Sequence, residues 1–295
     1  MRLGDGADVL TCEQFDRIRW LALRLTGIEL FPRHREVLAR KIRRLGIDGE
    51  PEFDALLNGA DVGDPEATRQ FVGLLTTNFS GFFRHPRHFD LAAEHALWAV
   101  HRRGAARLWS AAAASGEEPY SLAISLIEVF QRDHPPVTIL ATDIDEDALT
   151  AARQGEYGET ALSGLATGHR ERFFNPGMKA RRWRICQAVR DPVEFRRLNL
   201  TDRVWPAAGL FDVVFCRNVL MYLEANHRYA VLERIASILA SDGVLILDPT
   251  EHLGRVSPLF GPGTNGVYTR RRESCHATGV ASFPPVGLRT RNENL

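Results

Sequence analysis

The sequence predicts an α/β fold in which a small all-helical domain precedes a domain built on a mostly parallel sheet. Residues 10–75 show only the periodicity of amphipathic helices, and no alternation of apolar and polar residues occurs before residue 100. From residue 106, apolar runs of strand length alternate with segments of helix length. Strands that alternate with helices form βαβ units, whose neighbouring strands run parallel.

Four helices are predicted in residues 10–75. The segment CEQFDRIRWLALRLTGI places apolar residues at helical spacing and ends at Gly27. The segment PRHREVLARKIRRLGI begins with Pro32, which suits the first turn of a helix, and ends at Gly46. One side of this second helix is apolar, whereas the other carries a basic ridge. The basic ridge consists of Arg33, Arg40, Arg43 and Arg44. The segments PEFDALLNG and PEATRQFVGLLTTN complete the domain.

Residues 106–273 are predicted to form the second domain, with five strands and the helices that connect them. The strands fall at 106–113, 137–143, 211–216, 243–248 and 266–271. The helices fall at 117–131, 145–155 and 224–241. Residues 76–105 link the two domains and contribute a further helix. The tail 274–295 has little periodicity, so we expect it to be disordered.

Composition excludes several classes of protein. The chain has 295 residues, 44% of them hydrophobic and 25% charged, which is typical of a globular protein. No apolar run of about 18 residues predicts a membrane span, and the N-terminus lacks the pattern of a signal peptide. The four cysteines are isolated, and the ten histidines show no metal-ligand spacing. We therefore expect a reduced, cytoplasmic protein without a metal.

Net charge is zero, but basic residues gather in two segments. Residues 32–44 hold six Lys or Arg and one acid, and residues 169–197 hold nine Lys or Arg and three acids. Such patches fit acidic partners, either nucleic acid or an acidic protein surface, or they are ordinary solvated faces.

Residues at the ends of the predicted strands indicate the ligand, because open α/β sheets bind ligands beyond the carboxyl ends of their strands. The first strand runs into AAAASGEEPYS, which lacks GxGxxG, and Glu117 and Glu118 would repel a phosphate at this helix N-terminus. Asp143 ends the second strand, where a carboxylate can accept both hydroxyls of a ribose. Alternatively, Asp143 caps the following helix. A nucleoside with positive charge and no pyrophosphate fits S-adenosylmethionine.

Five stretches carry a resemblance to a known family. They occur in order between residues 76 and 270 and read TTNFSGFFRHPRHF, LWSAAAASGEEPYSLAI, ATDIDEDALTAARQGEY, FDVVFCRNVLMYL and GVYTRR. These stretches resemble the CheR-type chemotaxis receptor methyltransferases. The resemblance implies a Rossmann-like S-adenosylmethionine-dependent methyltransferase domain with a small antiparallel β insertion at about 172–195. It also implies methyl transfer from S-adenosylmethionine to receptor glutamates, with glutamate 5-O-methyl esters and S-adenosylhomocysteine as products.

The resemblance also implies roles for individual residues. The cofactor would be bound by Asn78, Ser80, Arg84, Glu118, Asp143, Asn199, Leu200, Arg217 and Asn218. Arg84 and Tyr222 would be catalytic, with Arg84 near the incoming carboxylate and Tyr222 at the methyl group; a half-buried packing role for Tyr222 stays open. Ser80 replaces a threonine that is common in the family, and PTEH from Pro249 replaces a His-Ser-Glu sequence. The second departure leaves substrate detail at that loop open.

The partner that the resemblance implies is the helical cytoplasmic stalk of a chemoreceptor. Its methylated sites are glutamates, so we expect the basic ridge to dock there. The turn NPGMKARR in the β insertion is short, which favours weak or no tethering to a receptor peptide. We expect a monomer. Two other functions stay open: a nucleic-acid methyltransferase on the same sheet, and a non-catalytic signalling module that keeps the fold.

Overall fold

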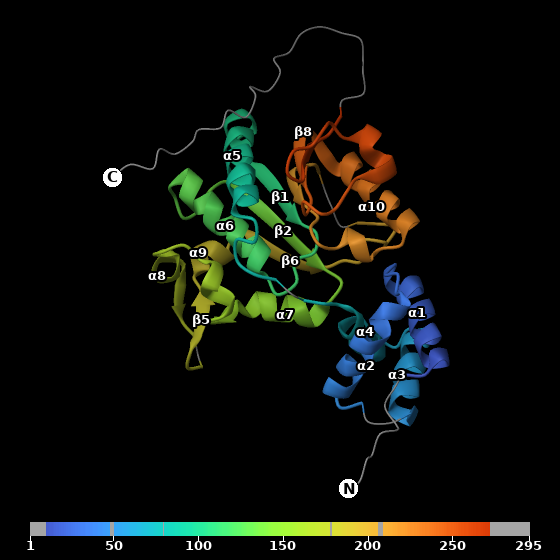
Figure 1. The fold of residues 1–295 in the computed structure, drawn as a ribbon. Coiled ribbons are helices and arrows are strands. Elements are labelled where there is room, and N and C mark those ends of the chain that lie inside the picture. Colours follow the sequence, from blue (N-terminus) through green and yellow to red (C-terminus); the bar gives the residue numbers. More distant parts are fainter. Residues whose placement is uncertain (1–9, 48–49, 79, 178, 206–208, 272–295) are drawn as a thin grey trace.

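The computed structural model describes residues 10–47, 50–78, 80–177, 179–205 and 209–271. The expected disordered tail, residues 274–295, lies outside the described residues. A helical domain lies against one end of an α/β domain, as Figure 1 shows. The helical domain consists of α1 (Cys12–Thr26), the 3-10 turn η1 (Pro32–His34), α2 (Arg35–Arg44), α3 (Glu50–Val62) and α4 (Pro65–Leu75).

Local sequence signals set the two ends of α1. The Thr11 hydroxyl accepts a hydrogen bond from the Gln14 backbone N–H, and the Gln14 side chain accepts one from the Thr11 N–H, which forms a capping box. Gly27 ends the helix with a φ of +74°, a left-handed conformation that favours glycine. A Cβ at Gly27 would lie 2.4 Å from Thr201 Cγ2. Glycine therefore also allows the helical domain to approach the α/β domain closely.

The α/β domain is built on a six-stranded sheet. Its strand order is β6–β2–β1–β7–β8–β9, and every neighbouring pair is parallel except β8 and β9. The strands are β1 (Ala106–Ser110), β2 (Val137–Asp143), β6 (Val193–Arg197), β7 (Phe211–Phe215), β8 (Leu239–Ile246) and β9 (Val267–Thr269). The predicted fold class, helices followed by a mostly parallel sheet, is confirmed.

Helices cover both faces of this sheet. Helices α5 (Pro86–Arg103) and α6 (Glu117–Phe130) pack on one face, and α10 (Ala225–Ile238) packs on the other (Figure 1). Successive side chains of a strand point to opposite faces. Leu108 therefore joins the apolar cluster beneath α5 and α6, whereas Trp109 joins the cluster beneath α10.

A second, three-stranded antiparallel sheet has the order β3–β5–β4. Its strands are β3 (Glu156–Gly158), β4 (Phe174–Pro176) and β5 (Arg182–Ile185). The short elements around it are η2 (Ala161–Gly164), α8 (His169–Phe173) and α9 (Gln187–Arg190). A small antiparallel β insertion is therefore present, but both of its boundaries differ from the expected range of about 172–195. Strand β3 precedes that range, and Val193–Arg197 joins the large sheet as its edge strand β6.

Two of the contacts between the domains join different parts of the α/β domain to the helical domain. At one, Ile28 forms an isolated antiparallel bridge with Leu223, and the Glu29 N–H donates to the Tyr222 carbonyl (2.8 Å). At the other, α4 contacts α7 (Glu146–Gln154).

Two 3-10 turns, η3 (Leu220–Tyr222) and η4 (Gly254–Leu259), complete the described elements. None of the helices in the described ranges is both long and apolar enough to cross a membrane.

Candidate active site

A cavity lies between the helical domain and the carboxyl ends of β1, β2 and β7. It encloses about 1480 Å³ of empty space, including solvent at its opening. All ten residues to which the resemblance gives a cofactor or catalytic role line this cavity: Asn78, Ser80, Arg84, Glu118, Asp143, Asn199, Leu200, Arg217, Asn218 and Tyr222.

Asp143 lies at the carboxyl end of β2 and is 9% exposed. Its Oδ2 accepts a hydrogen bond from the Ala114 N–H (2.8 Å), and its Oδ1 accepts one from the Asp145 N–H (3.0 Å). Burial raises the pKa of the Asp143 carboxyl, and these backbone hydrogen bonds oppose the rise. A carboxylate has about four acceptor positions, so both oxygens keep capacity for ribose hydroxyls. The alternative that Asp143 caps the next helix is wrong, because Asp145 is the N-cap of α7.

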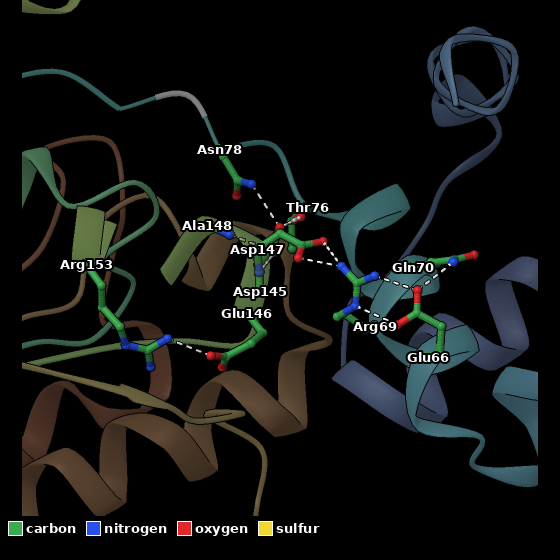
Figure 2. A network of polar contacts seen from close by, with 10 residues as sticks. All are labelled: Glu66, Arg69, Gln70, Thr76, Asn78, Asp145, Glu146, Asp147, Ala148 and Arg153. Atoms are coloured by element: carbon green, nitrogen blue, oxygen red, sulfur yellow. Dashed lines mark hydrogen bonds and ion pairs between the residues drawn. The ribbon is translucent and has the colours of Figure 1, made fainter. Parts of the chain in front are cut away.

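Asp145 connects this strand end to the linker from the helical domain (Figure 2). Its Oδ2 accepts hydrogen bonds from the Thr76 hydroxyl (2.6 Å) and from Asn78 Nδ2 (2.8 Å). Its Oδ1 accepts the backbone N–H groups of Asp147 (3.0 Å) and Ala148 (3.1 Å). Sequence reasoning missed Asp145. The available signal was an aspartate directly before an acidic first turn, which is typical of a helix N-cap.

Glu118 and Arg217 form a buried ion pair at the cavity wall. Arg217 Nη1 donates to Glu118 Oε2 (3.1 Å), and the two side chains are 2% and 14% exposed, respectively. Glu118 Oε1 accepts a hydrogen bond from the Ser110 hydroxyl (2.8 Å). Burial raises the pKa of the Glu118 carboxyl, and Arg217 and Ser110 oppose that rise. Arg217 Nη2 also donates to the Arg84 carbonyl (2.7 Å), so the pair holds the segment that carries Arg84.

The Arg84 guanidinium is half-exposed and faces an ionised carboxylate at long range. Arg84 Nη2 lies 4.0 Å from Asp248 Oδ2, and His85 Nε2 lies 3.4 Å from the same oxygen. Burial alone would raise the pKa of Asp248, but hydrogen bonds from Thr250 and Asn218 and the nearby His85 lower it to about 2. Among the described residues, none accepts a hydrogen bond from the Arg84 guanidinium. Its donors therefore remain available to a substrate carboxylate.

Glu251 holds the loop that carries Asn218 and Tyr222. Its carboxylate accepts hydrogen bonds from the N–H groups of Asn218 (2.9 Å), Leu220 (3.0 Å) and Met221 (3.3 Å). Asn218 has a φ of +55°, which is uncommon for a residue other than glycine. Tyr222 is 44% exposed and lines the cavity. Glu251 belongs to the PTEH departure, so that departure keeps a buried carboxylate beneath the loop. Sequence reasoning missed this role because the partners of Glu251 are backbone groups, which leave no side-chain pattern.

Asn199 and Leu200 follow β6 and form another part of the cavity wall. Asn199 Nδ2 donates to the Leu25 carbonyl in α1 (3.0 Å), and Asn199 Oδ1 accepts from the Thr201 N–H (3.0 Å). Leu200 is buried. Ser80 also lines the cavity, and its hydroxyl has no hydrogen-bond partner within the described part of the chain. Asn199 therefore joins the helical domain to the loop, and Ser80 keeps a free donor.

The helical domain contributes a wall that sequence reasoning did not predict. Its lining residues are Thr26, Ile28, Glu29, Leu30, His34, Val37, Leu38, Lys41, Leu74 and Leu75. Lys41 Nζ donates to the carbonyls of Leu74 (3.2 Å) and Thr76. The sequence predicted the stripe that includes Leu38 only as a packing surface. Its contact with a cavity depends on how the two domains dock, and no local pattern reports that.

The basic ridge lies on the surface of the helical domain. Arg33, Arg40, Arg43 and Arg44 are all exposed. The Arg33 guanidinium lies over the Phe31 ring, 4.6 Å from its centroid. The side chains of Arg40, Arg43 and Arg44 make no hydrogen bond or ion pair with the residues that the structure describes. Their charges are therefore available to an external partner.

The site combines acceptors for hydroxyl groups with an exposed tyrosine, Tyr222, and an arginine, Arg84, whose guanidinium makes no hydrogen bond within the described residues. Such a set can hold a nucleoside and orient a carboxylate. Within the described ranges, no group of three or more His, Cys, Asp or Glu side chains could hold a metal ion.

Comparison with known proteins agrees with this chemistry. Residues 78–262 match the family model "CheR methyltransferase, SAM binding domain". Chemotaxis protein methyltransferase 2 of Pseudomonas aeruginosa is 36% identical over 265 residues, which cover 88% of this chain and 93% of that protein. The chemotaxis protein methyltransferase of Salmonella typhimurium is 33% identical over 271 residues, which cover 90% of this chain and 92% of that protein. Among solved structures, the chain is similar to the N-methyltransferase NodS from Bradyrhizobium japonicum in complex with S-adenosyl-l-homocysteine. The two are 15% identical, and the match covers 55% of this chain and 60% of that chain. The TM-score is 0.33, which is too low to support an inference.

Proposed function

Because the chain belongs to the CheR methyltransferase family, whose members are S-adenosylmethionine-dependent methyltransferases of chemotaxis, we propose that it methylates glutamate side chains on the cytoplasmic domains of chemoreceptors. The product is a glutamate 5-O-methyl ester. One observation carries the proposal: ten residues from separate segments, to which the resemblance gives cofactor or catalytic roles, line a single cavity at the carboxyl ends of parallel strands.

The chemistry of the cavity wall supports S-adenosylmethionine as the cofactor. Asp143 has free acceptor positions for two ribose hydroxyls. Glu118, at the N-terminus of α6 and paired with Arg217, would meet the amino acid end of the cofactor. Asn199 and Leu200 would border the adenine, and Asn78 and Ser80 would close over the ligand. When bound, S-adenosylmethionine supplies a methyl group that an oxygen nucleophile can displace from a sulfonium.

The protein's own residues need only orient the reacting carboxylate and exclude water. A glutamate side chain has an unperturbed pKa of about 4.3, so it is ionised at neutral pH and needs no general base. Arg84 would hold the substrate carboxylate through two parallel hydrogen bonds. The Tyr222 hydroxyl would lie at the methyl group. Good orientation alone contributes roughly 7–11 kcal/mol to lowering such a barrier.

The basic ridge is the proposed docking surface for the receptor. The cytoplasmic stalk of a receptor presents glutamates, so Arg33, Arg40, Arg43 and Arg44 would attract it by electrostatic steering. Within the described residues the side chains of Arg40, Arg43 and Arg44 have no ion-pair partner, so docking would cost them no such pair.

Further features of the proposal concern the cellular setting. We propose that the protein acts in the cytoplasm as a monomer, without a metal, without nucleic acid and without inserting into a membrane. The short turn between β4 and β5 supports weak or no tethering to a receptor peptide. Family membership favours an enzyme over the non-catalytic signalling module.

The test incubates the protein with radiolabelled S-adenosylmethionine and receptor cytoplasmic fragments. We expect label on the fragment that mild base removes as methanol, because carboxylate methyl esters hydrolyse under those conditions. A fragment whose glutamates are replaced by alanine serves as the control and stays unlabelled. Label on added RNA or DNA, with none on the receptor fragment, would instead favour the nucleic-acid alternative.

A further inference from the structure

We propose that Asp145 is a positioning residue for the cofactor site: it fixes the linker segment 76–78 at the cavity wall and orients the carboxylate of Asp143. The inference rests on the proposed binding of S-adenosylmethionine between the two domains. Asp145 itself does not line the cavity, so it would act through its neighbours.

Two sets of hydrogen bonds carry the proposal. The Asp145 backbone N–H donates to Asp143 Oδ1 (3.0 Å), which fixes one oxygen of the proposed ribose acceptor. The Asp145 side chain accepts from the Thr76 hydroxyl (2.6 Å) and from Asn78 Nδ2 (2.8 Å), both through Oδ2. Figure 2 shows these two donors converging on Asp145 from the linker. Thr76, Asn78 and Asp143 all line the cavity. One residue therefore connects two walls of the same site.

The environment keeps Asp145 in its accepting, ionised form. Burial by itself raises the pKa of its carboxyl, but hydrogen bonds from Asn78, Thr76 and the first turn of α7 outweigh burial and lower it. The linker is also held from the helical domain, because Lys41 in α2 donates to the Thr76 carbonyl. Segment 76–78 is thus fixed from both sides, with its side chains on Asp145 and its backbone on the helix that carries the basic ridge.

A neighbouring ion pair provides a natural comparison. Arg69 in α4 pairs with both carboxylate oxygens of Asp147 and with Glu66 (Figure 2). Arg69 and Asp147 are 38% and 59% exposed, and exposed pairs of this kind contribute little. Asp147 lies in the first turn of α7, two residues after the N-cap Asp145, but contacts no residue of segment 76–78 in the network of Figure 2. It can therefore report what the loss of a charge and of an exposed ion pair between the domains does at this helix end.

The experiment compares Asp145→Asn with Asp147→Asn by calorimetry with S-adenosylhomocysteine. Asparagine caps helices as well as aspartate does, so Asp145→Asn keeps the α7 cap with its amide oxygen. Its amide nitrogen then faces both Thr76 and Asn78, which lose their charged acceptor. We expect affinity to fall about tenfold or more for Asp145→Asn, because hydrogen bonds to a charged acceptor are lost. For Asp147→Asn we expect a change within about twofold.

A double-mutant cycle with Thr76→Val tests the coupling directly. Valine removes the hydroxyl and keeps the shape, so the combined variant should lose less affinity than the two single effects multiplied. Multiplicative losses, or equal losses in Asp145→Asn and Asp147→Asn, would overturn the inference. So would wild-type affinity in Asp145→Asn. If the wild-type protein itself binds no S-adenosylhomocysteine, the proposed function fails first, and this inference fails with it.

Discussion

Arg217 can be tested as the residue that keeps a buried carboxylate charged. Arg217→Met keeps much of the side-chain volume and removes the guanidinium. It leaves Glu118 without its ion-pair partner (3.1 Å) and the Arg84 carbonyl without its donor (2.7 Å). We expect this variant to be strongly destabilised, and we expect its instability to depend on pH.

The size of the effect follows from burial. The Arg217 and Glu118 side chains are 2% and 14% exposed, so solvent can replace the lost partner only in small part. Removing one member of a buried pair typically costs about 3–5 kcal/mol. For a protein of this size, roughly 2–4 °C is lost per kcal/mol. The melting temperature should therefore fall by roughly 6–20 °C.

The sign of the pH dependence also follows. Burial raises the pKa of the Glu118 carboxyl and Arg217 opposes the rise, so removing Arg217 raises this pKa further. A carboxyl whose folded-state pKa lies above the unfolded value favours the fold at low pH, and the benefit is lost as pH rises through the folded-state pKa. The deficit of Arg217→Met relative to wild type should thus be larger at pH 8 than at pH 5. Urea unfolding at both pH values measures it.

Arg24→Met is the matched control. Arg24 Nη2 lies 2.6 Å from Asp61 Oδ1, but the two side chains are 39% and 42% exposed. Such a surface pair contributes at most about 1 kcal/mol and should show no change between pH 5 and pH 8. The reasoning is refuted if Arg217→Met lies within about 1 kcal/mol of wild type at pH 8, or if its deficit is the same at both pH values.

Three other predictions concern the cofactor, the chemistry and the receptor. Asp143→Ala should weaken S-adenosylmethionine and S-adenosylhomocysteine alike, by about tenfold to a hundredfold in calorimetry; unchanged affinity would contradict the ribose role. Tyr222→Phe should lower the rate of single-turnover methyl transfer at least about tenfold and leave cofactor affinity nearly unchanged. A wild-type rate would indicate that Tyr222 only packs against its neighbours. Arg40→Glu with Arg44→Glu should spare cofactor affinity but reduce methylation of a receptor fragment, and added salt should slow the wild type. If that double variant methylates the fragment as fast as the wild type at low salt, the basic ridge is only a solvated surface and does not dock the receptor.

The central strands were predictable because burial on both faces leaves continuous apolar runs. All five residues of β7, FDVVF, are buried, and such a run is typical of a parallel strand between two helical layers. The edge strand β6, VEFRR, was not predictable in this way, because it is half-exposed and carries three charged residues. Strand β3 has only three residues, which is too short for an alternating pattern.

Some residues of the site could likewise be predicted from the sequence, and others could not. Side chains at the carboxyl ends of strands, such as Asp143, could be predicted because topology brings those ends together. The role of Glu251 could not be predicted, because its partners are backbone N–H groups. Asp145 could be predicted as a helix N-cap, but its contact with Thr76 could not, because Thr76 lies in a distant segment. The role of Lys41 could not be predicted from the sequence, because its contact with the linker depends on how the two domains dock.

Two of the residues that hold this site share a common arrangement. Arg217 joins the Glu118 carboxylate to the Arg84 carbonyl, and Asp145 joins the Asp143 carboxylate to Asn78. Each thus connects a carboxylate at the cavity wall, Glu118 of α6 or Asp143 of β2, to the segment between the helical domain and α5. A substitution at either connecting residue should disturb both the carboxylate and the linker, so binding and turnover should change together. Tyr222 makes no such connection through its hydroxyl within the described residues, and it is the residue at which the chemical step can be measured apart from binding.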